Sequence, residues 1–304
     1  MNPFAISGFI NGIVASGLGL FIISRNWRSR TNQLFFFMTV ALGAWAFSYW
    51  QWLSTVDDIS TALFWTRAFA ASSLFIPVFY FHWVTLLLEI ENDQRYVRSI
   101  AYLFAVISFF SASSNQLVAG LVPKLSFPFW PIPGPLYTAY ILLIYLGLVG
   151  YALYLLAVFY KKAVSERKGQ IFYVILGTLL GFGGGLTNFF LWYDIPIPPY
   201  GNFLVAIFPF LLAYSLVKYK LFNVKTIAAE VLTFGIILVL LTEIALSRSI
   251  LETVMRCVFL VVLTIFGVYL IKSVYREVES REKIEKLAGE LETANGKLRE
   301  LDQQ

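Results

Sequence analysis

The chain has 304 residues, of which 59% are hydrophobic, 18% aromatic and only 13% charged. Soluble globular domains carry about 25% charged residues, so this composition excludes an ordinary soluble protein. The net charge of +5 does not indicate nucleic-acid binding, because the basic residues lie in short loops between apolar runs, where they orient membrane proteins.

Apolar stretches recur along most of the chain and predict an all-α polytopic membrane bundle, because about 20 apolar residues in a helix span the hydrocarbon core. We expect three parts: a bundle over residues 1–220, two further membrane helices over 221–273, and a cytoplasmic helix over 274–304. The nine predicted spans are roughly 4–24, 33–54, 60–88, 97–112, 136–160, 170–192, 201–217, 227–247 and 250–273.

The loops between these stretches alternate in charge. One set of alternate loops contains most of the basic residues: Arg25, Arg28, Arg30, Arg95, Arg98, Lys161, Lys162, Arg167, Lys168, Lys218, Lys220 and Lys225. The other set contains Lys124 and Arg248, beside Asp57, Asp58 and Asp194. Because cytoplasmic loops are enriched in Lys and Arg, the alternation predicts an outer N-terminus and a cytoplasmic C-terminus.

The longest outer connection, residues 113–135, is rich in proline and aromatic residues. Its prolines block a continuous helix: they are Pro123, Pro128, Pro131, Pro133 and Pro135. We expect Phe127, Phe129 and Trp130 at the depth of the lipid headgroups, where aromatic rings are favoured.

Glycines and prolines inside the apolar stretches predict local features of the bundle. The run Gly177, Gly181, Gly183, Gly184 and Gly185 predicts close helix packing, with a flexible point or a cavity wall as the alternative. Pro77 and Pro209 predict kinks in the third and seventh helices.

A few polar residues lie at membrane depth and are candidates for function, since such residues should face the bundle interior. Glu252 and Arg256 are four residues apart on one helix face, and with Glu243 they predict a charge network that ties the last two helices together. A proton- or ligand-responsive site is the alternative. His82, the one histidine, is expected to be hydrogen-bonded between aromatic rings, with pH sensing as the alternative.

A ligand pocket is expected to open outward between the third, fifth, sixth and seventh helices. Its predicted lining residues are Trp65, Arg67, Asn188 and Tyr193. Arg67 would hold an anionic group of the ligand, or alternatively extend to the outer headgroups. One histidine and one cysteine, Cys257, in separate helices cannot supply a zinc site, and no sequence motif predicts a cofactor or a catalytic residue.

The last helix carries an apolar seam in steps of three and four residues, which is the a/d pattern of a coiled coil. Its members are Ile284, Leu287, Leu291, Ala294, Leu298 and Leu301. A shorter seam upstream is out of phase with it, and the break lies near Arg281, where supercoiling should change locally. We expect a parallel two-stranded coil, with a solvated amphipathic tail as the alternative.

Two segments resemble bacterial membrane histidine kinases. The run REVESREKIEKLAGELETANGKLRELDQQ, residues 276–304, is similar to the signalling helix that leads into their phosphoacceptor domain. The junction KYKLFNV, residues 218–224, resembles the boundary that closes their N-terminal seven-transmembrane sensor region. The chain departs from that pattern by two extra predicted spans and by the absence of a phosphoacceptor helix and nucleotide motifs.

The resemblance implies a sensor and transmitter module of a two-component histidine kinase in the bacterial inner membrane, not itself an enzyme. It also implies a parallel homodimer that meets lipid and an unknown small ligand, and that reaches a response regulator only through a kinase core. A transporter or channel is the alternative, although no internal repeat is found and the membrane charges lie at the outer rim. A lipid-modifying enzyme would need a polar catalytic cluster, and none stands out.

Overall fold

The computed structural model describes residues 2–220, 233, 240, 244 and 250–301. It divides the chain into two units, Met1–Tyr219 and Lys220–Gln304. The chain is mostly helical, and six of its described helices are long and apolar enough to cross a membrane: Pro3–Arg25, Arg30–Ser54, Ile59–Leu87, Pro135–Lys162, Arg167–Trp192 and Leu251–Val274. The predicted span 227–247 lies outside the described residues, apart from three positions.

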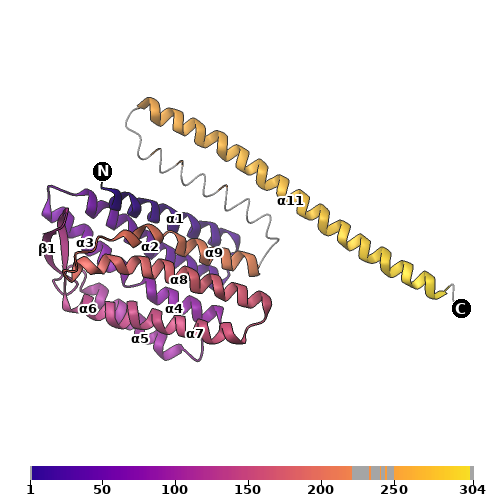
Figure 1. Ribbon diagram of the computed structural model, residues 1–304, viewed down its shortest axis with the longest axis horizontal. Helices are drawn as coiled ribbons and strands as arrows, with labels where there is room; N and C mark the ends of the chain where they lie inside the picture. The colour runs from indigo at the N-terminus through magenta and orange to yellow at the C-terminus, as the bar shows by residue number, and fades with distance from the viewer. Residues whose placement is uncertain (1, 221–232, 234–239, 241–243, 245–249, 302–304) are drawn as a thin grey trace. The chain divides into compact units, whose positions relative to one another are not determined.

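The helices of the first unit run alongside one another (Figure 1) and bury a large aromatic core. They are α1 (Pro3–Arg25), α2 (Arg30–Ser54), α3 (Ile59–Ser73), α4 (Ile76–Leu87), α5 (Arg95–Phe110), α6 (Pro135–Tyr140), the π-helix η1 (Ile141–Leu148), α7 (Val149–Lys162), α8 (Ser165–Trp192), the 3-10 helix η2 (Tyr200–Leu204) and α9 (Ile207–Lys220). The first seven predicted stretches are therefore all helical, although α5 and the apolar Tyr200–Leu216 segment are shorter than the six long helices.

Local signals at the helix ends explain where several helices begin. The side chain of Asn2 accepts a hydrogen bond from the amide of Phe4 and caps α1, with Pro3 at the first helical position. Asp58 caps α3 in the same way. Hydrogen bonds from the hydroxyls of Ser60 and Thr61 and from the Ser60 amide lower the pKa of the Asp58 carboxyl to about 2.

Both membrane prolines mark a break in a helix. The third predicted helix is interrupted between Ser73 and Ile76, and Pro77 lies in the first turn of α4, where a missing amide hydrogen costs no hydrogen bond. The seventh predicted helix is divided between η2 and α9, with Pro209 in the first turn of α9. Both prolines thus follow an interruption in the regular helix, whereas the predicted kinks stay a prediction.

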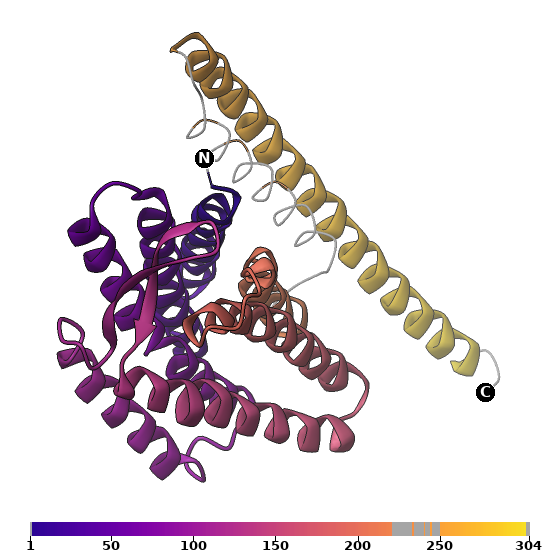
Figure 2. The ribbon, with the colours of Figure 1, turned by 60° about the vertical axis from the view of Figure 1, so that its left-hand side comes forward.

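The expectation of an all-α chain is wrong in the connection between α5 and α6, which forms an antiparallel hairpin of β1 (Val118–Lys124) and β2 (Phe127–Pro133). Figure 2 turns the hairpin end of the bundle towards the viewer. Phe127 and Trp130 are buried inside the protein and do not face lipid headgroups. The Trp130 ring packs on Trp52, 4.9 Å away between centroids, and the Trp52 indole donates to the carbonyl of Phe129 at 2.7 Å.

Lys124 fastens the hairpin to the end of α8. Its ammonium donates to the carbonyls of Leu191 and Trp192, at 2.7 and 3.3 Å, and pairs with Asp194 at 3.0 Å. The last carbonyls of a helix carry partial negative charge, so the partly buried Lys124 cation stabilises this end of α8. These contacts join the hairpin to the end of α8.

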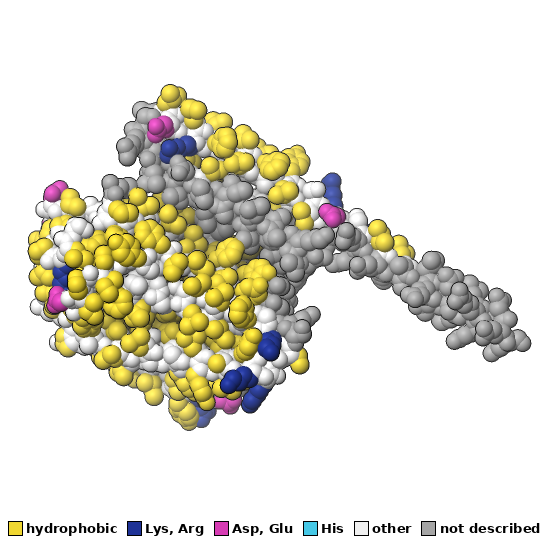
Figure 3. Space-filling model, in the orientation of Figure 1, with side chains coloured by type: hydrophobic (Ala, Val, Ile, Leu, Met, Phe, Trp, Pro, Cys, Tyr) yellow, Lys and Arg dark blue, Asp and Glu magenta, His cyan; other side chains and the backbone are white. Residues whose placement is uncertain are grey.

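The surface of the first unit is that of a membrane protein. Hydrophobic side chains cover most of the visible face in Figure 3, whereas Lys and Arg gather near the end away from the hairpin. Large apolar side chains that are exposed include Phe37, Ile100, Leu103, Phe110, Leu142 and Leu143. A patch of this extent on a soluble monomer would be exceptional, whereas in lipid it is the favourable surface.

The described part of the second unit is chiefly one helix, α11 (Ile250–Leu301), of 52 residues. No break separates the predicted membrane span from the predicted coil, and the helix continues through Arg281, where the two seams change phase. Gly267 lies against Thr233: a Cβ atom at Gly267 would meet the Thr233 methyl group at 2.1 Å. All six predicted seam residues lie on α11, and Ile284 and Leu287 are exposed; pairing with a second chain stays a prediction.

Candidate functional site

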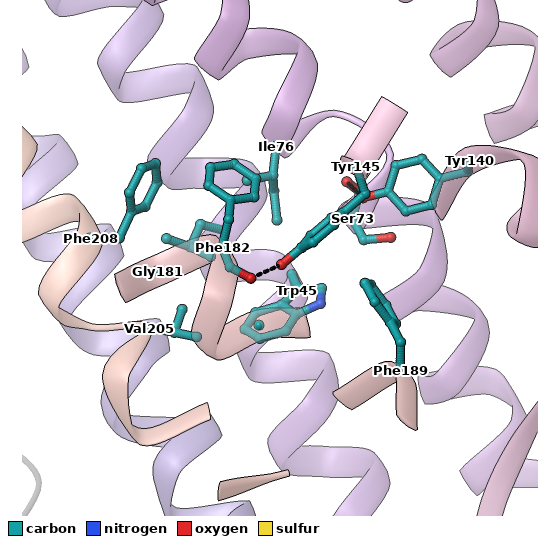
Figure 4. A pocket seen from close by; sticks show the side chains of 12 residues that line it. Trp45, Ser73, Ile76, Tyr140, Tyr145, Gly181, Phe182, Phe189, Val205 and Phe208 are labelled. Carbon is teal, nitrogen blue, oxygen red and sulfur yellow. Dashed lines mark hydrogen bonds between the residues drawn. The ribbon is translucent and has the colours of Figure 1, made fainter. Parts of the chain in front are cut away.

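A small cavity lies in the first unit between α2, the α3–α4 break, the α6–η1 junction, α8 and the η2–α9 segment. Its volume, counted as the space open to the centres of water-sized groups, is about 40 Å³. Figure 4 shows its wall of aromatic rings. The lining residues are Leu42, Trp45, Ser73, Ile76, Tyr140, Tyr145, Gly181, Phe182, Gly185, Phe189, Val205 and Phe208.

Tyr145 stands on the π-helix η1 and reaches across the cavity to α8. Its hydroxyl donates to the carbonyl of Phe182 at 2.5 Å (Figure 4). Gly185 makes room for this approach, since a Cβ atom there would lie 2.7 Å from the hydroxyl oxygen. A π-helix is rare and is frequently found at functional sites, because it redirects side chains that an α-helix would place elsewhere.

The glycines of α8 serve both roles that the sequence left open. Gly184 packs backbone to backbone on η2, because a Cβ atom there would meet the Gly201 carbonyl oxygen at 2.4 Å. Gly181 lies under Phe208, because a Cβ atom at Gly181 would meet the Phe208 Cβ atom at 2.2 Å. Gly181 and Gly185 also line the cavity. Close packing and a cavity wall are therefore combined in one run.

Phe208 connects the cavity to the seventh membrane segment. Its ring packs edge-on against Phe182 and Tyr80, with centroids 5.2 and 5.7 Å apart. The Tyr80 hydroxyl is hydrogen-bonded to the Thr178 hydroxyl at 2.5 Å, which fixes α4 against α8. Any group that displaces Phe208 must therefore disturb the contact between α8 and α9.

The four residues predicted to line a ligand pocket have separate partners in the structure, and none of them lines the cavity. Arg67 donates to the Asn115 side chain at 3.1 Å, and Tyr193 donates to the Thr138 hydroxyl at 2.9 Å. Trp65, half-buried on α3, packs against Phe64. Asn188 is buried and faces η2. Whether any of them binds a ligand stays a prediction.

Asn188 belongs to a buried polar cluster that joins α1, α8 and η2. Its amide nitrogen donates to the Asn202 side-chain oxygen at 3.2 Å, and the Asn202 amide donates to the Ser7 hydroxyl at 2.7 Å. Asn11 donates to the Asn202 backbone carbonyl at 2.9 Å. All four side chains are nearly inaccessible. Hydrogen bonds of this kind hold membrane helices together.

His82 lies in a second polar cluster, at the end of the bundle where α4 leads into α5. Its Nδ1 atom is 2.9 Å from the Tyr102 hydroxyl, and its Nε2 atom is 3.6 Å from Glu91. Glu91 also pairs with Arg30 at 2.6 Å and Arg98 at 3.5 Å. Partial burial opposes ionisation of Glu91, but the Arg30 hydrogen bond and the charges of both arginines outweigh it and lower the pKa of Glu91.

The predicted charge network of Glu243, Glu252 and Arg256 falls in the second unit. Glu252 and Arg256 lie on the first turns of α11, one helical turn apart, and Glu243 lies outside the described residues. The charge network of Glu243, Glu252 and Arg256 stays a prediction. Among the described residues, no group of three or more His, Cys, Asp or Glu side chains is placed to hold a metal ion.

The sequence interpretation missed Ser7, Asn11 and Asn202 of the polar cluster, and Tyr145, Phe182 and Phe208 of the cavity. A signal existed for Asn11, because an asparagine in the middle of an apolar stretch needs a partner. No comparable signal marked Tyr145, since the chain has 17 tyrosines and 29 phenylalanines. The rotation of each helix decides which of these rings meet.

Comparison with known proteins identifies the family. A family model of the N-terminal 7TM region of histidine kinase matches residues 8–225. The chain belongs to this family. The match to the 7TM sensor region ends one residue beyond Val224, the last residue of the junction motif. The chain is thus a multi-pass membrane protein with the sensor region of a histidine kinase, and no kinase catalytic domain matches it. No curated protein and no solved structure matches the chain.

Proposed function

We propose that the chain is the membrane sensory and transmitter module of a two-component histidine kinase. The 7TM region would respond to a stimulus, and α11 would relay its state to a kinase core and through it to a response regulator. The observation that carries the proposal is the family match over residues 8–225. The second support is the unbroken course of α11 from an apolar span into the heptad-like segment.

The charges of the bundle support an outer N-terminus and a cytoplasmic C-terminus in a bacterial inner membrane. Arg30 and Arg98 meet at Glu91, and Arg167 donates to the carbonyl of Leu87 at 2.7 Å. These contacts bring the basic connections α1–α2, α4–α5 and α7–α8 to one end of the bundle. The opposite end carries Asp58 and the Lys124–Asp194 pair. Under the positive-inside rule, the basic end is cytoplasmic.

Transmission through α11 requires a helix that carries rotation or displacement and a second chain that reads it. A parallel homodimer paired along the seam Ile284–Leu301 supplies both requirements. The phase change near Arg281 would let two packings of the pair have similar free energies, which is the condition for a two-state switch. The 7TM region would favour one packing over the other.

The test needs no knowledge of the stimulus. A histidine kinase core is fused after Gln304, and one to seven residues of helix-forming sequence are inserted in α11 between Val274 and Ile284. Insertion of seven residues, about two helical turns, restores the rotational phase and the heptad register of the seam, whereas insertion of two or five residues rotates the seam by roughly half a turn. We expect autophosphorylation to oscillate with insertion length and to return to the parent level at seven.

Phosphorylation that ignores insertion length would overturn the relay. A vectorial flux of a solute across proteoliposomes that hold the unfused chain would instead favour a transporter. Reporter fusions at Gln304 that are active only outside the cell would contradict the proposed orientation.

A further inference from the structure

The cavity walls exclude charged ligands. None of the twelve lining residues carries a charged side chain. Seven of them contribute hydrocarbon or aromatic surface: Leu42, Trp45, Ile76, Phe182, Phe189, Val205 and Phe208. A carboxylate, phosphate or ammonium group placed here would lose its hydration and find no opposite charge, which is strongly unfavourable.

The lining side chains carry four polar atoms: the indole nitrogen of Trp45 and three hydroxyl oxygens. All three hydroxyl groups have already donated their hydrogens. Ser73 donates to the Ala70 carbonyl at 2.7 Å, and Tyr140 donates to the Ser73 carbonyl at 2.7 Å. Tyr145 donates to the Phe182 carbonyl at 2.5 Å. A hydroxyl has one hydrogen and two acceptor lone pairs, so these oxygens are left with acceptor capacity. A ligand that is complementary to these oxygens therefore brings a hydrogen-bond donor.

The volume limits the size of the ligand. A water molecule needs roughly 10–15 Å³ on this measure, and an apolar cavity of about 150 Å³ accepts benzene. The cavity of about 40 Å³ therefore admits a short chain only if a neighbouring side chain yields. Phe208 is the side chain that we expect to yield. It packs directly on Gly181, with no free space between α8 and α9, so a displacement of Phe208 changes the contact between these two helices.

We propose that this cavity is a binding site for a small, uncharged, mainly apolar molecule with one hydrogen-bond donor, of the class of short-chain alcohols. The inference rests on the proposed sensor function and names the ligand class of its 7TM region. Binding displaces Phe208, and the tight seam of Gly181 and Gly184 converts that displacement into a shift of α9. Protein interiors are close-packed, so a displaced side chain shifts the helix that carries it.

The experiment is photolabelling of the full chain in lipid vesicles. The probe is a butanol that carries a photoreactive diazirine, and adducts are located by mass spectrometry. Tyr145 reports the cavity, and Tyr154 on α7, which is 63% exposed, reports labelling from the lipid. We expect Tyr145 labelling to saturate with probe concentration and Tyr154 labelling to rise in proportion to it.

Competition in the wild-type chain tests the ligand class. Butan-1-ol and methyl propyl ether are isomers, but only the alcohol has a hydrogen-bond donor. At equal concentration in the bilayer, we expect butanol to protect Tyr145 about fivefold better, the worth of one ordinary hydrogen bond. Butyrate and butylammonium should not protect it. Equal protection by the ether would remove the donor requirement and overturn the proposed class.

A filling variant tests the location. Val205→Leu adds a methylene group to the cavity wall, and Val40→Leu makes the same change on the exposed face of α2. We expect Val205→Leu to lower Tyr145 labelling about fivefold or more, the effect of overpacking a filled site, and Val40→Leu to leave it unchanged. If Val205→Leu does not fold, the competition experiment in the wild-type chain tests the proposed site by itself.

The results separate this inference from the proposed function. Saturable labelling of Tyr145 together with phosphorylation that ignores the length of α11 would support the cavity and refute the relay. Phosphorylation that oscillates with insertion length, together with Tyr145 labelling that merely follows Tyr154, would support the relay and overturn the cavity site.

Discussion

The 7TM unit and α11 differ in where their apolar side chains find partners. In an apolar 18-residue window of Ile59–Leu87, 72% of the residues are buried within the chain, whereas in the corresponding window of Leu251–Val274 on α11 the share is 6%. The rings of the bundle meet one another: Phe69 alone contacts Trp45, Tyr49, Trp52 and Trp192. The bundle thus carries its own core, whereas most apolar side chains of Leu251–Val274 are exposed among the described residues.

The largest expected effect sharpens this difference with one pair of substitutions. Phe69→Ala removes the ring at the centre of the aromatic core and should lower the free energy of unfolding by about 3–5 kcal/mol. Phe259→Ala on α11 removes an exposed ring and should change it by less than about 0.5 kcal/mol. Thermal unfolding of the purified chain in one detergent measures both. Equal losses would show that α11 has a core of its own.

Glycine substitutions on α8 probe the closest helix contact. Gly184→Leu forces a side chain into the Gly201 backbone and should cost about 1–3 kcal/mol or more. Gly183→Leu, one residue away, is the control, because a Cβ atom there meets nothing within 4 Å. The same unfolding measurement applies. If the two variants are equally stable, the seam between α8 and η2 is not tightly packed.

The buried asparagine cluster should contribute less. Asn202→Ala removes two side-chain hydrogen bonds, to Asn188 and Ser7. Membrane hydrogen bonds average ~0.6 kcal/mol each, so a loss of about 1–2 kcal/mol is expected. Asn115→Ala, whose side chain bonds Arg67 at the exposed surface, should cost much less. Similar losses for the two would mean that burial adds nothing to these bonds.

The smallest expected effect is a dependence on pH. The pKa of Glu91 is lower in the folded chain than in the unfolded one, so its contribution is fully present above the unfolded value of ~4.3. The contribution is lost as the pH falls through the lower, folded pKa. Glu91→Gln should remove this part of the acid sensitivity of unfolding. Glu89→Gln, at an exposed pair with Arg167, is the control; a larger effect at Glu89 would contradict the assignment.

Much of the fold follows from features that the sequence states locally. Helix positions follow from apolar length, and Pro77 marks a break because it cannot donate within a helix. The hairpin was missed because Pro128, Pro131 and Pro133 weaken a strand pattern, although in a two-stranded sheet a proline can lie where no hydrogen bond is required. Its pairing is set by contacts with Trp52 and α8, which are remote in sequence.

The cavity could not have been predicted in the same way. Arg67, Asn188 and Tyr193 looked alike because each is a polar group near the outer end of a helix. Their side chains nevertheless go to Asn115, Asn202 and Thr138, since helix rotation decides their neighbours. Tyr145 reaches the cavity from a π-helix. The wider turn of a π-helix changes the direction of its side chains, and the spacing of apolar residues in the sequence does not reveal it.

The hydrogen bonds from Lys124 to the last turn of α8 connect the hairpin to a helix of the sensor region. A protein or lipid that binds and displaces the hairpin would also displace α8, which lines the cavity with Gly181 and Phe182. A force on the hairpin and a small molecule in the cavity would thus both act on α8. A binder raised against the hairpin would be a way to set the state of this receptor without its natural stimulus.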